Sequence, residues 1–289
     1  MVKRTVVVIG ATGSQAEPWW QNSSITPIFI IFGPSRVTLP NPPRKNSLPA
    51  ALSSSSAPVE IEQGKAIADA AAATPTLQHF VWSALPDPVA LSGGQFLNVD
   101  HWKGKSLITE YIQTQKPELW AKTTTILFPN YFENCLTSPD RYLPVKDKTG
   151  SYTFSFPHSP TTVLPNVAIA DTGKLAHIIL KSGSTYFTKT IAFWAQALSE
   201  AEKLAELGEY YNVSTRYHPV SASEFQQLLM TCDGMSEDIA LDFTEQLMIF
   251  EKCGNVYARD EFVQANKIPG LQLQTWSDFI RKHSLLDEH

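Results

Sequence analysis

Short runs of apolar, β-branched residues alternate with longer amphipathic stretches along most of the chain. Residues 5–9, 78–84 and 123–128 are such runs, and each is typical of a strand buried in a parallel sheet. Residues 167–170 predict a shorter strand of the same kind. Because helical stretches separate these runs, the pattern predicts an α/β fold with a mostly parallel sheet.

Helix signals fill the intervals between the strands. Residues 62–73 are rich in alanine and predict a helix that ends before Pro75. Asp100 is placed to be the N-cap of a helix through Gln115, and Asp171 can cap the helix after the short strand. The last hundred residues predict four more helices, at residues 199–211, 221–232, 236–253 and 276–283, of which the first two open with Ser-x-x-Glu capping boxes.

The composition changes abruptly after the first strand. Residues 18–59 contain no Asp or Glu but hold eight of the chain's 20 prolines, and residues 53–56 are all serine. Such a stretch does not easily form regular helices. Only residues 28–32, closed by Gly33 and Pro34, predict a strand there.

Length and composition limit the classes of protein to consider. The 289 residues are 43% hydrophobic, which is enough for one large core or one core with a small lobe. The net charge is -5 and no basic block dominates, so we expect no nucleic-acid partner. The apolar runs near the start are too short to span a membrane or to form an export signal. Cys135, Cys232 and Cys253 form no C-x-x-C pair, so we expect reduced, buried thiols in a cytoplasmic protein.

A glycine-containing turn follows the first strand. It reads Gly10-Ala11-Thr12-Gly13-Ser14-Gln15. Its glycines suit a backbone that turns sharply and approaches a pyrophosphate, although a tight turn without a ligand is the alternative. The acidic residue that NAD-binding folds carry about 20 positions further on is missing from the sequence, whereas the basic residue Arg36 lies downstream. NADP(H) is therefore favoured over NAD.

His101 and Lys105 lie four positions apart on a predicted helix and therefore share one face. A proton donor and a lysine in this arrangement can serve the reduction of a carbonyl. The lysine would hold the ribose hydroxyls and bias the pKa of the donor. A solvated helix face is the ordinary alternative.

A polar loop follows the strand at residues 123–128. It reads Pro129-Asn130-Tyr131-Phe132-Glu133-Asn134. Ligands of doubly wound sheets lie beyond the carboxyl ends of the strands, and this loop offers rings for stacking and polar groups for hydrogen bonds. The alternative is a capped turn.

In this order, these features resemble the NmrA-like family, an atypical branch of the short-chain dehydrogenase/reductases. The similar positions include the glycine turn, Gln63-Gly64-Lys65, residues 79–83, His101 with Lys105, Tyr131 to Asn134, and residues 167–171. The similarity covers residues 1–15 and about 58–289.

The resemblance implies a Rossmann-like, doubly wound parallel sheet with helices on both faces and a smaller C-terminal lobe. It places the nucleotide-binding part at residues 1–170 and a lobe for substrate or partner at residues 171–289. It implies that His101 replaces the tyrosine of the conventional Y-x-x-x-K motif, which makes His101 and Lys105 the candidate catalytic pair. The residues implied to contact NADP(H) are the glycine turn, Lys65, Lys105, Tyr131, Phe132, Glu133 and Asn134.

Residues 16–57 depart from the family pattern, which has a helix, two strands and a second helix in this interval. Here the interval is shorter and rich in proline, and Ala16 stands at the third motif glycine. The explanations are a remodelled loop or an error in the gene structure, such as a retained intron or a shifted reading frame. The abrupt edges favour the second. If the segment is translated as written, cofactor affinity should fall.

Three functions stay open on the sequence alone. The first is an NADP-dependent oxidoreductase that reduces a carbonyl or conjugated double bond of a small molecule, as in fungal secondary metabolism. The second is a redox-sensing regulator, cytoplasmic or nuclear, that binds a transcription factor or another protein partner. The third is a remnant whose pocket residues 16–57 destroy. No metal site is expected, and the substrate is not indicated.

Overall fold

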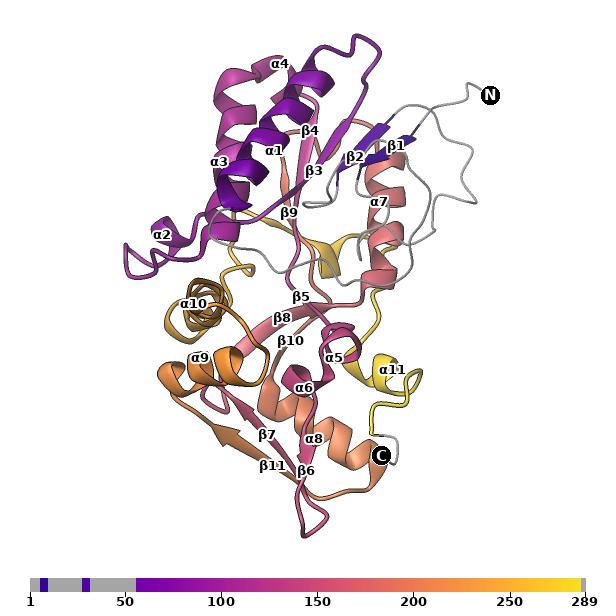
Figure 1. Cartoon of the computed structure of the whole chain (residues 1–289). Helices are drawn as coiled ribbons and strands as arrows, with labels where there is room; N and C mark the ends of the chain where they lie inside the picture. Colours follow the sequence, from indigo (N-terminus) through magenta and orange to yellow (C-terminus); the bar gives the residue numbers. More distant parts are fainter. Residues whose placement is uncertain (1–5, 10–27, 32–55, 287–289) are drawn as a thin grey trace, which may run out of the picture.

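Six parallel strands form the main sheet of the computed structural model, which describes residues 6–9, 28–31 and 56–286. The strand order is β1-β2-β3-β4-β9-β12, and every neighbouring pair is parallel (Figure 1). The strands are β1 (Val6–Ile9), β2 (Ile28–Ile31), β3 (Phe80–Ala84), β4 (Thr123–Leu127), β9 (Thr190–Ala192) and β12 (Val263–Gln264).

Helices cover both faces of this sheet. Phe80 and Trp82 of β3 pack with Ala68 and Ile108 in one apolar core, whereas Val81, between them, packs into another. The first core joins the sheet to α1 and α3, and the second joins it to α7, on the other side of the sheet (Figure 1). These helices are α1 (Ser56–Ala72), α3 (Asp100–Gln115) and α7 (Thr172–Lys181). The predicted Rossmann-like architecture is confirmed.

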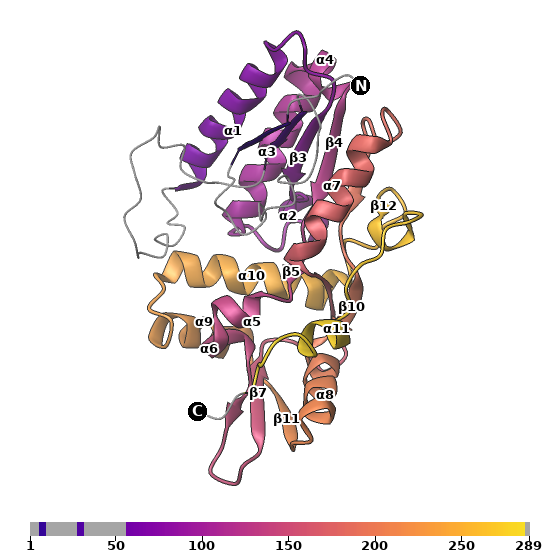
Figure 2. The same cartoon turned by 90° about the vertical axis from the view of Figure 1, so that its right-hand side faces the viewer.

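A lower lobe lies beyond one end of the main sheet (Figures 1 and 2). It contains two three-stranded sheets, β10-β8-β5 and β11-β7-β6. Their strands are β5 (Asn130–Tyr131), β6 (Val145–Lys146), β7 (Tyr152–Phe156), β8 (Val163–Val167), β10 (Gln196–Ser199) and β11 (Thr215–Pro219). Segments from both sides of residue 170 contribute to each part, because β5 to β8 precede α7 while β9 and β12 return to the main sheet.

Short and medium helices complete the described chain. Around the main sheet lie α2 (Pro88–Leu91), α4 (Pro117–Trp120) and η4 (Ala265–Lys267). The lower lobe and its junction contain α5 (Asn134–Thr137), α6 (Pro139–Tyr142), η3 (Ile169–Asp171), α8 (Glu200–Tyr211), α9 (Ala222–Thr231), α10 (Glu237–Cys253) and α11 (Trp276–Ile280). Helix α10 lies at the junction between the two parts, where it is seen end-on in Figure 1 and lengthwise in Figure 2.

Local capping signals predict several helix starts correctly. The boxes at Ser199 and Ser221 are both formed, with each serine hydroxyl accepting the backbone N–H of the glutamate three positions on. The strand predicted at residues 167–170 is wrong. Strand β8 ends at Val167, because the carboxylate of Glu133 takes the N–H of Ile169 and the chain turns into η3.

The three cysteines are free, as expected, but only one of them is buried. Cys135 is buried in α5, where its thiol donates to the carbonyl of Phe132. Cys232 and Cys253 are exposed, because each lies at the carboxyl end of a surface helix. The expectation of three buried thiols is therefore wrong for two of them.

Candidate active site at the sheet rim

The carboxyl ends of the parallel strands lie along one edge of the main sheet, which we call the rim. Strands β1, β3 and β4 reach the rim at Ile9, Ala84 and Leu127. Helices α1 and α3 each connect two neighbouring parallel strands, so both begin at the rim and run back along the sheet. The rim thus brings together the end of β1, the starts of α1 and α3, and the loop after β4.

The glycine turn, Gly10 to Gln15, lies outside the described residues, as does Arg36. The strand before the turn, β1, is separated from β3 by β2. Neighbouring strands lie about 4.8 Å apart, so the end of β1 is about 10 Å along the rim from the end of β3. The chain therefore leaves β1 at the same rim at which α3 begins, two strands away.

His101 lies in the first turn of α3 and contacts helix α10 with both ring nitrogens. Its Nδ1 is 2.5 Å from Oδ1 of Asp242, and its Nε2 is 2.9 Å from Oε1 of Gln246. The ring of Phe243 lies at 6.3 Å, nearly parallel to the imidazole. These contacts fix the imidazole against α10.

The N-terminus of α3 is capped by a residue from another helix. The N-cap position is Val99, not Asp100 as predicted, and Val99 has no side-chain acceptor. Instead, Oδ2 of Asp242 accepts the backbone N–H groups of Asp100 and His101, at 3.0 and 3.3 Å. The predicted cap is wrong because Asp100 is itself the first helical residue.

Lys105 lies one turn further along α3, and only 12% of its side chain is exposed. Its Nζ is 3.8 Å from Oε1 of Glu60, the fifth residue of α1, whose side chain is also buried. Burial lowers the pKa of Lys105, and the negative charge of Glu60 opposes that shift. The rim therefore holds a largely buried ammonium group beside one carboxylate.

Lys65 points away from this pair. Its Nζ lies 5.2 Å from the ring centre of Tyr111. Tyr111 follows Lys105 by six residues, about 9 Å further along α3 from the rim. The structure thus places Lys65 on the outer surface between α1 and α3 and does not bring it together with Lys105.

The loop after β4 divides into structural and accessible positions. Phe132 is buried and packs against Trp276 of α11. Both carboxylate oxygens of Glu133 accept the N–H of Ile169, and burial raises the pKa of Glu133. Asn130, Tyr131 and Asn134 are partly exposed, and the ring of Tyr131 lies 6.3 Å from the ring of Phe128.

Local sequence patterns gave no indication of Glu60, Asp242 or Gln246 as site residues. Asp242 and Gln246 are more than 140 positions from His101, so no local spacing links them to it. The sequence does indicate a polar face on helix α10, because Asp242, Glu245 and Gln246 are spaced three and four positions apart. Glu245 accepts both the backbone and the amide N–H groups of Asn98, just before α3.

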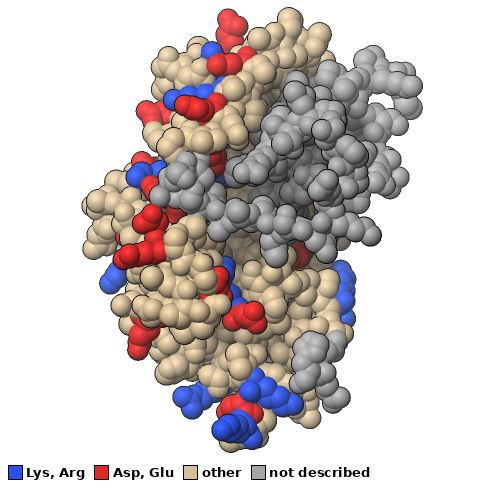
Figure 3. Space-filling model, viewed as in Figure 1, with Lys and Arg blue, Asp and Glu red and all other residues tan. Residues whose placement is uncertain are grey.

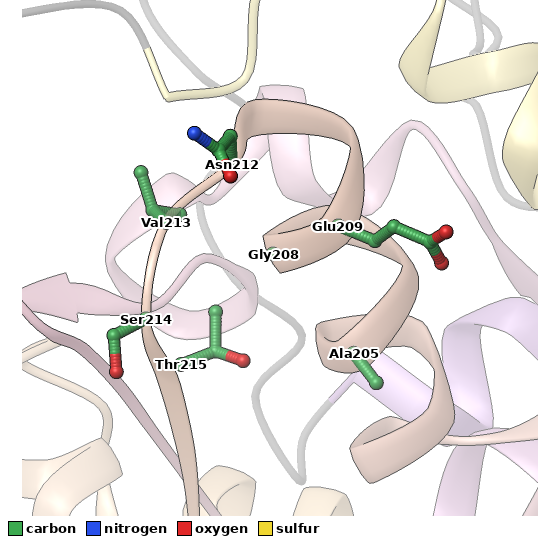
Figure 4. A pocket seen from close by; sticks show the side chains of 7 residues that line it. All are labelled: Ala205, Gly208, Glu209, Asn212, Val213, Ser214 and Thr215. Atoms are coloured by element: carbon green, nitrogen blue, oxygen red, sulfur yellow. The ribbon is translucent and has the colours of Figure 1, made fainter.

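A separate surface hollow of about 490 Å³ lies in the lower lobe, at the carboxyl end of α8 (Figure 4). It is lined by Ala205, Gly208, Glu209, Asn212, Val213, Ser214 and Thr215. A Cβ atom on Gly208 would lie 2.7 Å from Thr215, so this glycine allows α8 to pack closely on β11. The hollow contains none of the candidate site residues.

Charges are unevenly spread over the face seen in Figure 3. Basic side chains gather at the lower end, in the region of the β6–β7 hairpin, and acidic ones lie nearer the junction with α10. Within residues 6–9, 28–31 and 56–286, no cluster of His, Cys, Asp and Glu could hold a metal ion. None of the helices in the same ranges is both long and apolar enough to cross a membrane.

A parallel sheet with helices on both faces and polar groups at its carboxyl rim defines the class of Rossmann-type α/β proteins. The chain belongs to the NmrA-like family, whose sequence profile matches residues 49–280. The first 48 residues lie outside this match. An NmrA-like family domain-containing protein of Dictyostelium discoideum is 25% identical over 228 residues, which are 77% of this chain and 70% of the relative.

Solved structures show the same fold at low sequence identity. NmrA, a negative transcriptional regulator crystallised with NADP, aligns with a TM-score of 0.56 at 19% identity, covering 95% of this chain and 89% of NmrA. The NADPH-dependent quinone oxidoreductase QOR2 of Escherichia coli aligns with a TM-score of 0.61 at 15% identity, covering 95% and 98%. Leucoanthocyanidin reductase of Vitis vinifera, solved with NADPH, has a TM-score of 0.55 at 14% identity, covering 78% and 72%. The neighbours thus include both reductases and a regulator.

Proposed function

We propose that this chain binds NADP(H) at the rim and reduces a carbonyl or a conjugated double bond of a small molecule. The observation that carries the proposal is Lys105, a largely buried cation at the rim of a parallel sheet. The chain's membership of the NmrA-like family and the similar structures solved with NADP or NADPH support the same cofactor. When bound, NADP(H) supplies the hydride for such a reduction.

The described rim residues fit the ribose part of this cofactor. The ammonium group of Lys105 has three donors, and its contact with Glu60 at 3.8 Å leaves donors for the ribose hydroxyls. The N–H groups at the start of α3 are taken by Asp242, so we assign the pyrophosphate to the glycine turn, Gly10 to Gln15. We place Tyr131 and Asn134 beside the nicotinamide.

We assign proton delivery to Lys105 and a positioning role to His101. Both ring nitrogens of His101 contact α10, so the imidazole is not presented to a substrate. Burial lowers the pKa of Lys105, which makes its ammonium group a better acid near neutral pH than an exposed lysine. The sequence had suggested His101 as the proton donor, so this proposal moves that role to Lys105.

The test is NADPH oxidation with a panel of aldehydes, ketones and quinones. Lys105→Met should lower kcat/KM by about 100-fold or more, as loss of a proton donor does. The matched control is Lys103→Met, because Lys103 lies on the same helix but has 39% of its side chain exposed and pairs with Asp100. NADPH binding without turnover of any compound would exclude the reductase.

A second candidate is a regulator that senses the redox state of the cofactor, in the cytoplasm or nucleus, and binds a protein partner. The contact of His101 with Asp242 and Gln246 favours it, because this contact links the rim to the helix at the junction of the two parts. A ligand shifts such an equilibrium only through unequal affinities. Calorimetric titration with NADP⁺ and NADPH tests this idea, and equal affinities would remove it.

A further inference from the structure

Helix α10 connects the start of α3 to the lower lobe. Oδ2 of Asp242 accepts two N–H groups of the first turn of α3, and Oδ1 contacts Nδ1 of His101. One carboxylate therefore holds both the backbone and the side chain at the start of the helix that carries Lys105. In both views α10 lies between this helix and the lower lobe (Figures 1 and 2).

The position of α3 depends on this carboxylate for a physical reason. The first N–H groups of a helix have no partner within the helix, and Val99 supplies none. A carboxylate at this end also interacts favourably with the helix dipole. Only 15% of the Asp242 side chain is exposed, so water is a poor substitute for it.

Residues of the lower lobe contact α10 next to Asp242. Phe243, next to Asp242, has the imidazole of His101 at 6.3 Å and the guanidinium of Arg141 at 5.3 Å from its ring centre. Nε and Nη2 of Arg141 contact Oδ2 of Asp233, at 2.8 and 2.6 Å, in the loop between α9 and α10. These contacts connect α6 and that loop to α10 and to His101.

We propose that Asp242 is a positioning residue: it sets the first turns of α3, and so the place of Lys105, and couples the lower lobe to cofactor binding at the rim. This inference rests on the proposed binding of NADP(H). Asp242 acts through His101 and the backbone of α3 and touches no reacting atom.

The experiment compares the full-length wild type with Asp242→Ala, Asp242→Asn and Glu245→Gln. The first readout is amide hydrogen exchange at Asp100 and His101 without cofactor. The second is the Kd for NADPH, from its fluorescence. The matched control is Glu245→Gln, because Glu245 lies one turn away on the same face of α10 but binds Asn98 rather than the start of α3.

We expect Asp242→Ala to speed exchange at both amides and to weaken NADPH binding by about tenfold, the effect of losing a partly buried charged cap. Asp242→Asn keeps an oxygen for the two N–H groups and should recover most of the affinity, while the NMR signals of the His101 ring nitrogens shift. Glu245→Gln should bind NADPH as the wild type does.

The outcomes separate the inference from the proposed function. Faster exchange in Asp242→Ala with an unchanged Kd for NADPH would overturn the coupling, and unchanged exchange would overturn the cap itself. If the wild type binds no NADPH, the proposed function fails and the coupling to the cofactor fails with it.

Discussion

The ammonium of Lys105 experiences two opposing effects at the rim. Burial favours its neutral form and lowers its pKa, whereas Glu60, 3.8 Å away, favours the charged form. Burial is the larger effect, so the side chain loses its proton at a lower pH than an exposed lysine does.

This pKa shift predicts the pH dependence of the proposed reaction. If Lys105 delivers the proton, kcat/KM should fall as the pH rises through the lowered pKa, because the ammonium is then lost. Lys105→Arg keeps a positive charge at all accessible pH values but is a poor acid, so it should bind NADPH and lose turnover. Steady-state rates between pH 6 and 10 test this. An identical fall of kcat/KM at high pH in the wild type and in Lys105→Arg would contradict the assignment.

A buried histidine predicts how stability changes with pH. His79 is 4% exposed, and its Nε2 lies 2.7 Å from the hydroxyl of Thr124. Burial lowers the pKa of His79 from 6.5 to about 4. Between these two values the unfolded chain binds a proton that the native chain does not, so the free energy of unfolding falls as the pH is lowered.

The contribution of neutral His79 to the free energy of unfolding is complete above pH 6.5. It is lost progressively down to about pH 4, by about 3 kcal/mol in total. His79→Gln keeps a donor for Thr124 but has no titration, so its urea unfolding should depend less on pH in this window. The control is His218→Gln, because His218 is exposed in β11. Equal slopes for the wild type and His79→Gln would contradict the prediction.

At the scale of elements, Gly64 determines how closely α1 and α3 pack. A Cβ atom at Gly64 would lie 2.4 Å from Cδ1 of Ile108, whose side chain is buried. The helices run in the same direction, with Glu60 beside Lys105 and Asp69 beside Lys116. The glycine of the Gln-Gly-Lys segment therefore has a packing role in this structure.

Gly64→Ala should lower the free energy of unfolding by about 1–3 kcal/mol through overpacking. Gly104→Ala is the matched control in the same helix pair, because its Cβ would meet Glu60 at an ordinary 3.6 Å. That variant should be neutral or stabilising, since alanine is the better helix former by about 1 kcal/mol. Urea titrations measure the free energy of unfolding of both variants. In the double variant Gly64→Ala/Ile108→Ala, the loss of this free energy should be smaller than the sum of the losses in the two single variants.

At the scale of the whole molecule, cofactor binding should stabilise the native chain. A ligand at 100 times its Kd adds about 2.7 kcal/mol to the free energy of unfolding, which raises Tm by about 5 °C or more in a chain of this size. We expect this shift with NADPH and a smaller one with NADH, followed by tryptophan fluorescence. Lys105→Met should lose most of it, and the absence of any shift in the wild type would favour a remnant that binds no nucleotide.

The segment at residues 16–57 bears on the same experiment. It contains β2 and the first two residues of α1, and the family profile begins to match only at residue 49. Sequencing the mRNA across codons 16–57 tests whether the segment is translated as written. A transcript with a different reading frame there would support an error in the gene structure.

Much of the fold could be predicted from local sequence. The buried strands at 78–84 and 123–128 were visible as runs rich in apolar and β-branched residues, because a strand covered on both faces buries successive side chains. The capping boxes at Ser199 and Ser221 were visible because they require only residues three positions apart. The His101–Lys105 spacing likewise placed both residues in the first turns of one helix.

Only the tertiary structure decided what these residues contact. The start of α3 is capped by Asp242, 142 positions away from Asp100, and Lys105 is paired with Glu60 of another helix. Such contacts depend on how helices pack across the sheet and across the junction. Local sequence spacing cannot indicate them, because the partners are far apart in the sequence. The sequence by itself thus determined the parallel sheet and the residues near its rim, because periodicity and capping are local. The roles open to His101, Lys105 and Lys65 were decided by packing, because burial and charge pairing arise between segments that meet only in the folded chain.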